Sequence, residues 1–147
     1  MNANFILTGF ADEIYTDFDK QLNHLNKLGM KYFEIRGVDG KNISELSIDE
    51  VLAVKSKMDK AGIKVSSVGS PIGKIKITDD FDAHVTLLKH IIKVAKILDT
   101  KYIRVFSFFI PEGENAQDYR DEVMRRMIEM TKIAESEGVI LLHENEK

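Results

Sequence analysis

The sequence contains no cysteine, no long apolar run and no excess of basic residues. The lack of cysteine excludes disulfides, thiolate metal ligands and a cysteine nucleophile, so a bound metal must use carboxylate, histidine or carbonyl groups. No stretch approaches the roughly 18 consecutive apolar residues of a membrane span, and we see no secretory signal pattern. We therefore expect a cytoplasmic protein with no membrane partner.

The net charge of the chain indicates whether nucleic acid is an expected partner. The net charge is -3, with acidic and basic residues interspersed, whereas a protein that binds nucleic acid usually presents a basic face to the phosphates. We therefore expect no nucleic-acid partner. With 147 residues, 44% of them hydrophobic and 31% charged, the chain is long enough and apolar enough to bury a core in water. We expect residues 1–147 to form a single domain.

Five short apolar runs, rich in β-branched or aromatic residues, have the length of strands. They are NFILTGF (4–10), KYFEIRG (31–37), IKVSSVG (63–69), KYIRVFSFF (101–109) and VILLHE (139–144). The segments between them carry apolar residues three or four positions apart, which predicts amphipathic helices. These helices are expected at about 18–28, 47–61, 81–98 and 123–134.

Helix boundaries support this assignment. Ser47, with Glu50 three residues later, is typical of a helix start, and Gly29, Gly62 and Gly138 are typical of helix ends. Strands and helices therefore alternate along the chain. Such alternation predicts parallel strands that are joined by right-handed crossovers, with helices covering at least one face of the sheet.

Two closures of this sheet are conceivable: an open doubly wound sheet, or a (β/α)8 barrel cut after its fifth strand. The nucleotide-binding form of the open sheet has three glycines in its first turn, and TGFADEI (8–14) has one. In a barrel, polar groups at the carboxyl ends of the strands build the active site. We therefore predict an α/β fold of (β/α)8 TIM-barrel type, a partial barrel of parallel strands truncated after strand five. Such polar groups follow every predicted strand, as Asp12 and Glu13, Glu34 and Arg36, Ser70 to Lys74, Ser107, and His143 to Glu146.

Motifs at the predicted strand ends resemble a known family. GFADEI, EIRGVDGKNI, VSSVGSPIGKI, YIRVFSFF and LLHENEK occur in this order. Together they are similar to the N-terminal five-eighths of a sugar phosphate isomerase/epimerase of the xylose isomerase-like TIM-barrel superfamily. The resemblance implies a metal-dependent enzyme that moves a proton next to the carbonyl of a small sugar or sugar phosphate. Because a closed barrel takes about 250 residues, we expect this chain to be inactive by itself.

The resemblance also implies the role of Glu144. In the family, the first metal ligand is a glutamate at the end of the fifth strand, and Glu144 matches that position, which makes it the candidate catalytic and metal-binding residue. The remaining ligands follow on strands six to eight, so we expect this chain not to bind Mn2+ or Mg2+ tightly. His143 lies one residue away and is expected on the opposite strand face, packed towards a helix or exposed.

Two strands are expected to place charges in the same barrel layer. Alternate strands of a (β/α)8 barrel contribute side chains to common layers, so Glu34 and Arg104 are predicted to form an ion pair near the substrate pocket. Arg36 shares a strand face with Glu34, and Phe106 shares one with Arg104, so both are substrate-binding candidates. The alternative is that Glu34 and Arg104 are unrelated surface charges.

The segment GSPIGK (69–74) follows the third predicted strand. Ser70, Lys74 and the backbone N–H groups of this segment are candidates for binding an anionic sugar or its phosphate, although ordinary turn chemistry explains the same residues. The rings of FSFF (106–109) either line a pocket or pack into the core. Three histidines, His24, His84 and His90, are predicted to lie on helix surfaces.

Two other functions compete with the enzyme. One is a non-catalytic half-barrel module that self-associates or complements a separate C-terminal fragment. The other is a metal-dependent endonuclease of the same superfamily, which the net acidity disfavours. In either case, open strand edges would recruit further chains, so we expect self-association through those edges. A flatter, flavodoxin-like sheet with helices on both faces is the structural alternative.

Overall fold

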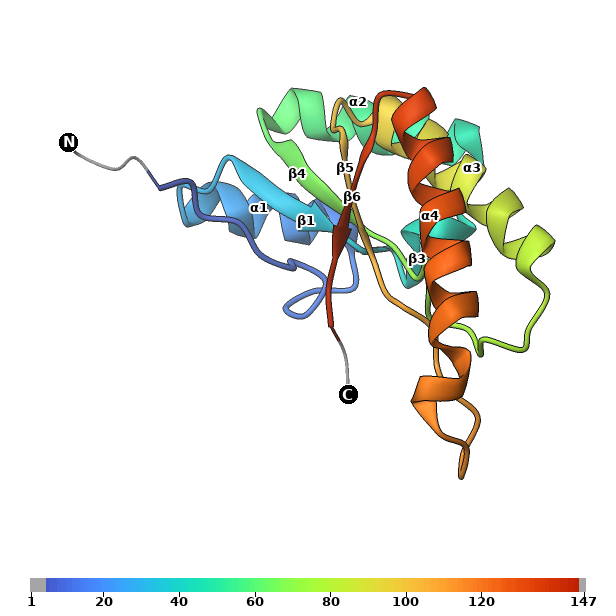
Figure 1. Ribbon diagram of the computed structural model, residues 1–147. Coiled ribbons are helices and arrows are strands. Elements are labelled where there is room, and N and C mark those ends of the chain that lie inside the picture. Colours follow the sequence, from blue (N-terminus) through green and yellow to red (C-terminus); the bar gives the residue numbers. More distant parts are fainter. Residues whose placement is uncertain (1–4, 146–147) are drawn as a thin grey trace.

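Four parallel strands form the central sheet of the computed structural model, which describes residues 5–145 (Figure 1). Their order in space is β1-β4-β5-β6, which is also their order along the chain. Two short strands pair antiparallel outside this sheet. The strands are β1 (Tyr32–Ile35), β2 (Gly37–Val38), β3 (Lys41–Asn42), β4 (Lys64–Gly69), β5 (Tyr102–Val105) and β6 (Ile140–His143), and the helices are α1 (Phe18–Lys27), η1 (Ile43–Glu45), α2 (Ile48–Ala61), α3 (Phe81–Ile97), η2 (Ala116–Tyr119) and α4 (Arg120–Ser136).

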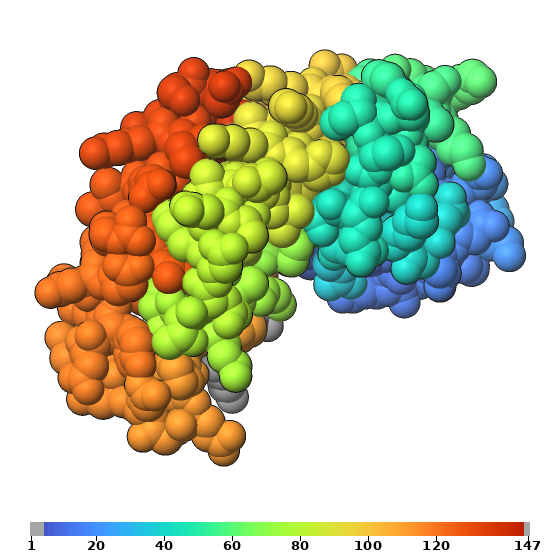
Figure 2. Space-filling view, turned by 90° about the vertical axis from the view of Figure 1, so that its right-hand side faces the viewer, coloured from blue at the N-terminus to red at the C-terminus, as the bar shows by residue number. Residues whose placement is uncertain are grey.

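The long helices lie on one side of the sheet and contact one another in chain order, from α1 to α4. Figure 2 shows this helical face as an arch that runs from the N-terminal to the C-terminal helices. A doubly wound sheet would need helices on both faces. The arrangement therefore matches the predicted partial barrel of TIM type and not the flat alternative. Within residues 5–145, none of the helices combines the length and the apolar character required to cross a membrane.

Helix ends follow the sequence prediction. The side chain of Ser47 accepts a hydrogen bond from Glu50 N, and the Glu50 side chain accepts one from Ser47 N, which together form a capping box at the start of α2. Gly62 ends the same helix in the left-handed conformation, with φ of 66°. Gly29 and Gly138 have the same conformation after α1 and α4. Each glycine lets the chain turn directly into the next strand.

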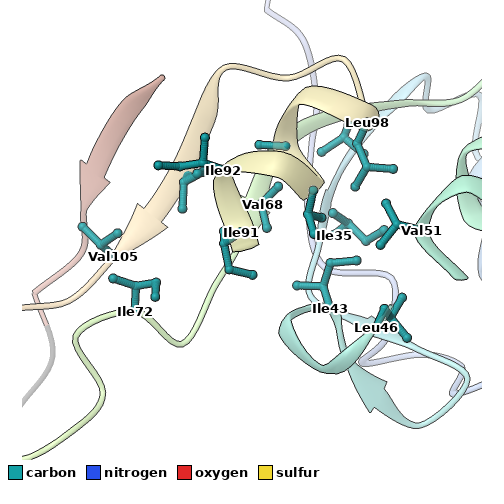
Figure 3. Close-up of a cluster of buried hydrophobic side chains, with 14 of the residues drawn as sticks. Ile35, Ile43, Leu46, Val51, Val68, Ile72, Ile91, Ile92, Leu98 and Val105 are labelled. Carbon is teal, nitrogen blue, oxygen red and sulfur yellow. The ribbon is translucent and has the colours of Figure 1, made fainter. Parts of the chain in front are cut away.

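The core lies between the sheet and the helices. Figure 3 shows Ile35, Val68 and Val105, from three neighbouring strands, together with Ile91 and Ile92 of α3, and all five are buried. Burying an aliphatic side chain of this size contributes about 1.5–3 kcal/mol. Since successive residues of a strand point to opposite faces, the intervening side chains of β1 and β5 point away from the helices, to the concave face.

The predicted first strand is wrong over most of its length. Residue 4 lies outside the described residues, and from 5 to 10 only Phe10 pairs with the sheet, in a single parallel bridge to Glu34 of β1. Phe5, Ile6 and Leu7 are 88%, 68% and 74% exposed. Apolar β-branched sequence favours a strand, but a ladder also needs neighbours. This segment has the short β1 on one side only.

The predicted strand at 101–109 is too long. β5 ends at Val105, and the following residues bond to the loop after β4, where Phe106 N donates to Ile72 O and Phe108 N donates to Gly73 O. Phe108 has a φ of 72°, which turns the chain away from the strand direction. The loop therefore replaces a continued β5, and the ring of Phe108 packs in the core.

A hairpin between β2 and β3 was not predicted. Asp39 and Gly40 connect the two strands, and both have positive φ, 51° and 82°. An Asp-Gly pair is the preferred sequence for the two-residue turn of such a hairpin. The turn was therefore readable in VDGK (38–41), although each strand has only two residues.

His84 contradicts its predicted place on a helix surface. It is only 5% exposed, and its Nε2 accepts a hydrogen bond from Gly73 N at 2.8 Å. The loop after β4 covers this part of α3, so the imidazole satisfies a buried backbone N–H. Burial lowers the pKa of His84 below 6.5, and the nearby charge of Arg126 lowers it further.

The lowered pKa of His84 predicts a pH-dependent stability. Because the unfolded chain takes up a proton near pH 6.5 that the folded chain resists, the free energy of unfolding should decrease as the pH falls below about 6.5. Urea unfolding between pH 7 and pH 5 measures this. The variant His84→Gln, which keeps an acceptor without the titration, should lose this part of the pH dependence, whereas His90→Gln should retain it. Equal pH profiles for His84→Gln and the unmodified chain would contradict the assignment.

Candidate functional site

Three charged side chains meet at the carboxyl ends of the strands. Nη1 of Arg104 lies 3.4 Å from Oε1 of Glu34 and 3.3 Å from Oε2 of Glu144. The predicted ion pair between Glu34 and Arg104 is therefore confirmed, and Glu144 joins it. The side chains of Arg104 and Glu34 are 12% and 19% exposed, and that of Glu144 is 50% exposed. One largely buried guanidinium thus interacts with two carboxylates from different strands.

Gly69 allows this cluster to form. Glu34 and Arg104 belong to β1 and β5, which are separated by β4, and Gly69 of β4 pairs with Arg104 in the ladder. A Cβ at Gly69 would lie 3.1 Å from Glu34 Oε1 and 3.2 Å from both Arg36 Cβ and Phe10 Cε1. The missing side chain leaves the space through which the ion pair crosses the middle strand.

Cations and aromatic rings alternate along the same rim. The guanidinium carbon of Arg36 lies 4.3 Å from the centroid of the Phe10 ring, and that of Arg104 lies 5.2 Å from the same centroid. The guanidinium carbon of Arg104 also lies 4.9 Å from the centroid of the Phe106 ring, and Lys74 Nζ lies 4.3 Å from the same centroid. Each such cation–ring contact is worth about 0.5–2 kcal/mol. The stack holds Arg104 in place between two rings.

Sequence reasoning missed Phe10. It is the last residue of the wrongly predicted first strand, two positions before Asp12, the first of the polar residues that were considered at that strand end. Phe106, by contrast, was a candidate, and the structure buries it at 4% exposure against Arg104. An aromatic residue at a predicted strand end was the available signal for Phe10.

Arg36 is engaged by two acids that follow the first segment. Its Nε and Nη2 donate to the two carboxylate oxygens of Asp12 at 2.8 and 3.1 Å, and Nη2 also donates to Glu13 at 3.2 Å. The hydrogen bond with Asp12 is the largest cause of the raised pKa of Arg36. Asp12 and Arg36 also line a small pocket of about 270 Å³ with Thr16 and Asn42. Arg36 therefore connects the N-terminal segment to β1.

The polar groups of the loop after β4 form hydrogen bonds within the loop and with β5 and α3. The hydroxyl of Ser70, a buried residue, donates to Arg104 O at 2.6 Å and accepts from Ile72 N at 3.2 Å. The N–H of Gly73 goes to His84 and that of Lys74 to Pro71 O. These backbone groups do not form the predicted anion cradle, because folding uses them internally. In this structure Ser70 positions the backbone of β5.

Two buried atoms of the cluster have no hydrogen-bond partner within residues 5–145. They are Oε1 of Glu34, an acceptor, and Nε of Arg104, a donor. Buried polar groups are nearly always bonded, so each exception calls for a partner. The two belong to residues that contact each other at the carboxyl end of the sheet.

The residues present do not fit a divalent metal by themselves. In the described part of the chain, no group of three or more His, Cys, Asp or Glu side chains is placed to hold one. Mg2+ and Mn2+ prefer several oxygen or imidazole ligands, and the carboxylate of Glu144 already pairs with the cation Arg104. His143 is exposed and follows the opposite strand face from Glu144, since it pairs with Val105 in the ladder.

The role of Gly69 leads to a prediction on stability. In Gly69→Ala, the new methyl group would press on Glu34, Arg36 and Phe10, so we expect a loss of about 1–3 kcal/mol in the free energy of unfolding. Chemical denaturation measures this. The control is Gly9→Ala, because a Cβ at Gly9 would have no atom within 4 Å, and it should change the free energy by less than about 0.5 kcal/mol. Equal effects of the two substitutions would refute the role given to Gly69.

Solved structures share this architecture. A xylose isomerase-like TIM barrel protein from Mycobacterium smegmatis in complex with magnesium matches with a TM-score of 0.72 and 14% identity, over 95% of this chain and 55% of its own. The probable 3-DHS dehydratase from Bacillus anthracis matches with a TM-score of 0.74 and 12% identity, over 95% and 52%. A D-psicose 3-epimerase, solved in the presence of D-fructose, matches with a TM-score of 0.66 and 15% identity, over 91% and 50%.

These likenesses show the fold, and the chain spans about half the length of the structures it matches. Among proteins with curated functions, none matches the sequence significantly. The family model described as xylose isomerase-like TIM barrel matches residues 22–147. Since this match covers most of the chain, the protein belongs to the xylose isomerase-like TIM barrel family.

Proposed function

We propose that this chain forms part of the active site of a metal-dependent isomerase or epimerase acting on a small sugar or sugar phosphate. The observation that carries the proposal is the cluster of Glu34, Arg104 and Glu144 at the carboxyl ends of the strands, where barrel enzymes bind their substrates. Family membership and the similarity to a D-psicose 3-epimerase support the same chemistry.

The accessible part of the cluster suits a hydroxyl group of the substrate. A sugar hydroxyl can donate a hydrogen bond to the half-exposed carboxylate of Glu144. Phe10 and Phe106 keep the guanidinium of Arg104 between their rings. Lys74, at the far end of this stack, is assigned to the anionic group of a sugar phosphate.

Glu144 is assigned to proton transfer. Its carboxylate is half exposed at the rim, and it can accept a proton from a carbon next to a carbonyl. The negative charge then lies on the oxygen of the substrate, and we assign its stabilisation to the guanidinium of Arg104, which contacts Glu144. Return of the proton by Glu144 to the neighbouring carbon gives an isomer, whereas an epimer requires that a second acid, on the other face of the substrate and from another polypeptide segment, protonates the original carbon.

Mn2+ or Mg2+ would polarise the substrate carbonyl in this chemistry. Because residues 5–145 do not group enough ligands for such an ion, the additional ligands would have to come from another polypeptide segment. This is also why a second function is retained: a non-catalytic half-barrel module that associates with itself or with a C-terminal fragment.

Proton exchange separates the two functions. D-fructose in D2O, with Mn2+ present, would be followed by NMR with the chain alone and with the C-terminal half of the D-psicose 3-epimerase as a separate polypeptide. We expect loss of a carbon-bound proton signal in the mixture, and a rate at least about 100-fold lower with Glu144→Gln, because the base is removed. Glu129→Gln, on α4, is the matched control and should leave the rate unchanged.

Several outcomes would count against the enzyme. Exchange that survives Glu144→Gln would remove the assigned base. No exchange with D-fructose, D-psicose or a sugar phosphate in any mixture, although the two polypeptides form a complex, would favour the non-catalytic module.

A further inference from the structure

His84 is a buried titratable group that the proposed mechanism does not use. It lies in the first turn of α3, and its Nε2 accepts the hydrogen bond from Gly73 N at 2.8 Å. A neutral imidazole has one N–H and one acceptor nitrogen, so this bond assigns the proton to Nδ1. The contact with Gly73 therefore requires the neutral form of His84.

Gly73 is connected tightly to the segment that follows β5. Gly73 O accepts a hydrogen bond from Phe108 N, and Ile72 O accepts one from Phe106 N. A Cβ on Gly73 would lie only 2.0 Å from Phe106 O, so the two backbones pack directly against each other. A displacement of Gly73 is therefore passed on to Phe106 and Phe108.

This segment and the loop after β4 position the cations of the rim. Lys74 and Arg104 both lie over the ring of Phe106. The hydroxyl of Ser70, in the same loop, donates a hydrogen bond to Arg104 O. Arg104 in turn contacts the carboxylate of Glu144. The place of the loop thus determines the place of the guanidinium beside the candidate base.

The surroundings of His84 disfavour a proton on its ring. Burial lowers the pKa of His84, and the charge of Arg126, a buried residue of α4, lowers it further. The ring of Phe108 lies 6.0 Å from the imidazole, between the ring centroids. The loop after β4 carries two more cations, Lys74 and Lys76. A protonated His84 would therefore be a buried cation near other cations.

The acidic side chains of these elements do not compensate such a charge. Within residues 5–145, Arg126 is the one charged group that acts on the pKa of His84. The segment 106–110 carries no charged residue, and Asp82, on α3 itself, is exposed. The remaining acids have other partners: Glu122 pairs with Arg125 and Arg126, Glu129 pairs with Arg125, Asp79 accepts from Lys76 N, and Asp80 accepts from Asp82 N and Ala83 N.

We propose that His84 is a proton-sensitive positioning residue of the rim. As a neutral imidazole it holds the loop after β4, and the segment 106–108 bonded to that loop, against α3. A protonated imidazole carries an N–H at both nitrogens, so two donors would face each other across the 2.8 Å that now separate Nε2 and Gly73 N. Protonation therefore releases the loop from α3 and shifts the ring of Phe106.

The release has a consequence for the candidate site, which rests on the proposed function. When Phe106 and the Ser70 hydroxyl shift, Arg104 loses two of the contacts that hold it. The ion pair of Arg104 with Glu144 at the rim then loses its fixed geometry. The site is therefore expected to be assembled at neutral pH and disassembled in acid, with His84 as the controlling group.

NMR of the 15N-labelled chain measures the release directly. Between pH 7.5 and pH 5, the amide signals of Gly73, Phe106 and Phe108 and the Nε–H signal of Arg104 should follow one titration curve. Its midpoint should lie below pH 6.5 and equal that of the imidazole of His84. Below the midpoint, protection of Gly73 N–H from hydrogen exchange should fall at least about 10-fold, because its acceptor is lost.

Two variants separate the loss of the acceptor from the effect of a nearby charge. His84→Gln keeps an acceptor without the titration and should hold these signals at their neutral positions down to pH 5. His84→Leu has neither acceptor nor charge, and at pH 7 it should already show the acid positions and the weak protection of Gly73. His90→Gln, on the same helix, is the control and should titrate like the unmodified chain.

Three outcomes would overturn the proposal. They are the absence of a His84 transition in this pH range, a His84 transition that leaves the loop and Arg104 signals in place, and an unchanged transition in His84→Gln. Full protection of Gly73 N–H in His84→Leu at pH 7 would show that the imidazole does not hold the loop, and would equally overturn it.

The effect on the site is read separately, in the D-fructose exchange assay with the C-terminal half of the D-psicose 3-epimerase. The rate at pH 5.5 relative to pH 7 should be at least about 3-fold lower for the unmodified chain than for His84→Gln, because only the former releases the loop. Equal ratios would remove the effect of His84 on the site. Release of the loop without exchange in any mixture contradicts the proposed function and leaves the role of His84 standing.

Discussion

The guanidinium of Arg104 is the interaction on which the concave face depends. It contacts carboxylates from β1 and from the end of β6, and it lies between the rings of Phe10 and Phe106. These contacts join elements that are far apart in the sequence. A largely buried charge is costly unless it is paired. The guanidinium of Arg104 therefore depends on the two carboxylates, and its ion pair with Glu34 depends on the space left by the missing side chain of Gly69.

The core and the rim are coupled through the loop after β4. Nε2 of His84, on α3, accepts a hydrogen bond from Gly73 N. Gly73 O in turn accepts a hydrogen bond from Phe108 N. Ser70, in the same loop, bonds the backbone of Arg104. This loop thus connects the buried face of α3 to the residues that hold the guanidinium. The Ser70 hydroxyl and the backbone N–H groups of this loop therefore stabilise the fold.

Half of a barrel has a physical problem that a whole barrel lacks. A closed ring has no strand edges, whereas this sheet ends at β1 and at β6. The residues at both ends are apolar, as strands in a parallel sheet usually are, because such strands are buried on both faces. The same property that makes β6 a good barrel strand leaves Ile140 and Leu142 exposed here.

The sequence by itself determined the local features and the order of the elements. Helical periodicity, the capping box of Ser47 and Glu50, and the glycines after three helices depend on neighbours within a few positions. The pairing of Glu34 with Arg104 was also predictable, because alternate strands of a barrel share a layer.

Tertiary structure decided what depends on distant partners. Residues 5–9 have strand-like sequence and no second neighbour, Phe106 to Phe109 bond to a loop instead of continuing β5, and His84 is buried by that loop. The meeting of Glu144 with Arg104 follows from the register of β6 on β5. Such contacts join residues that are far apart in the sequence. A local sequence pattern depends only on neighbouring residues, so it does not specify these long-range contacts.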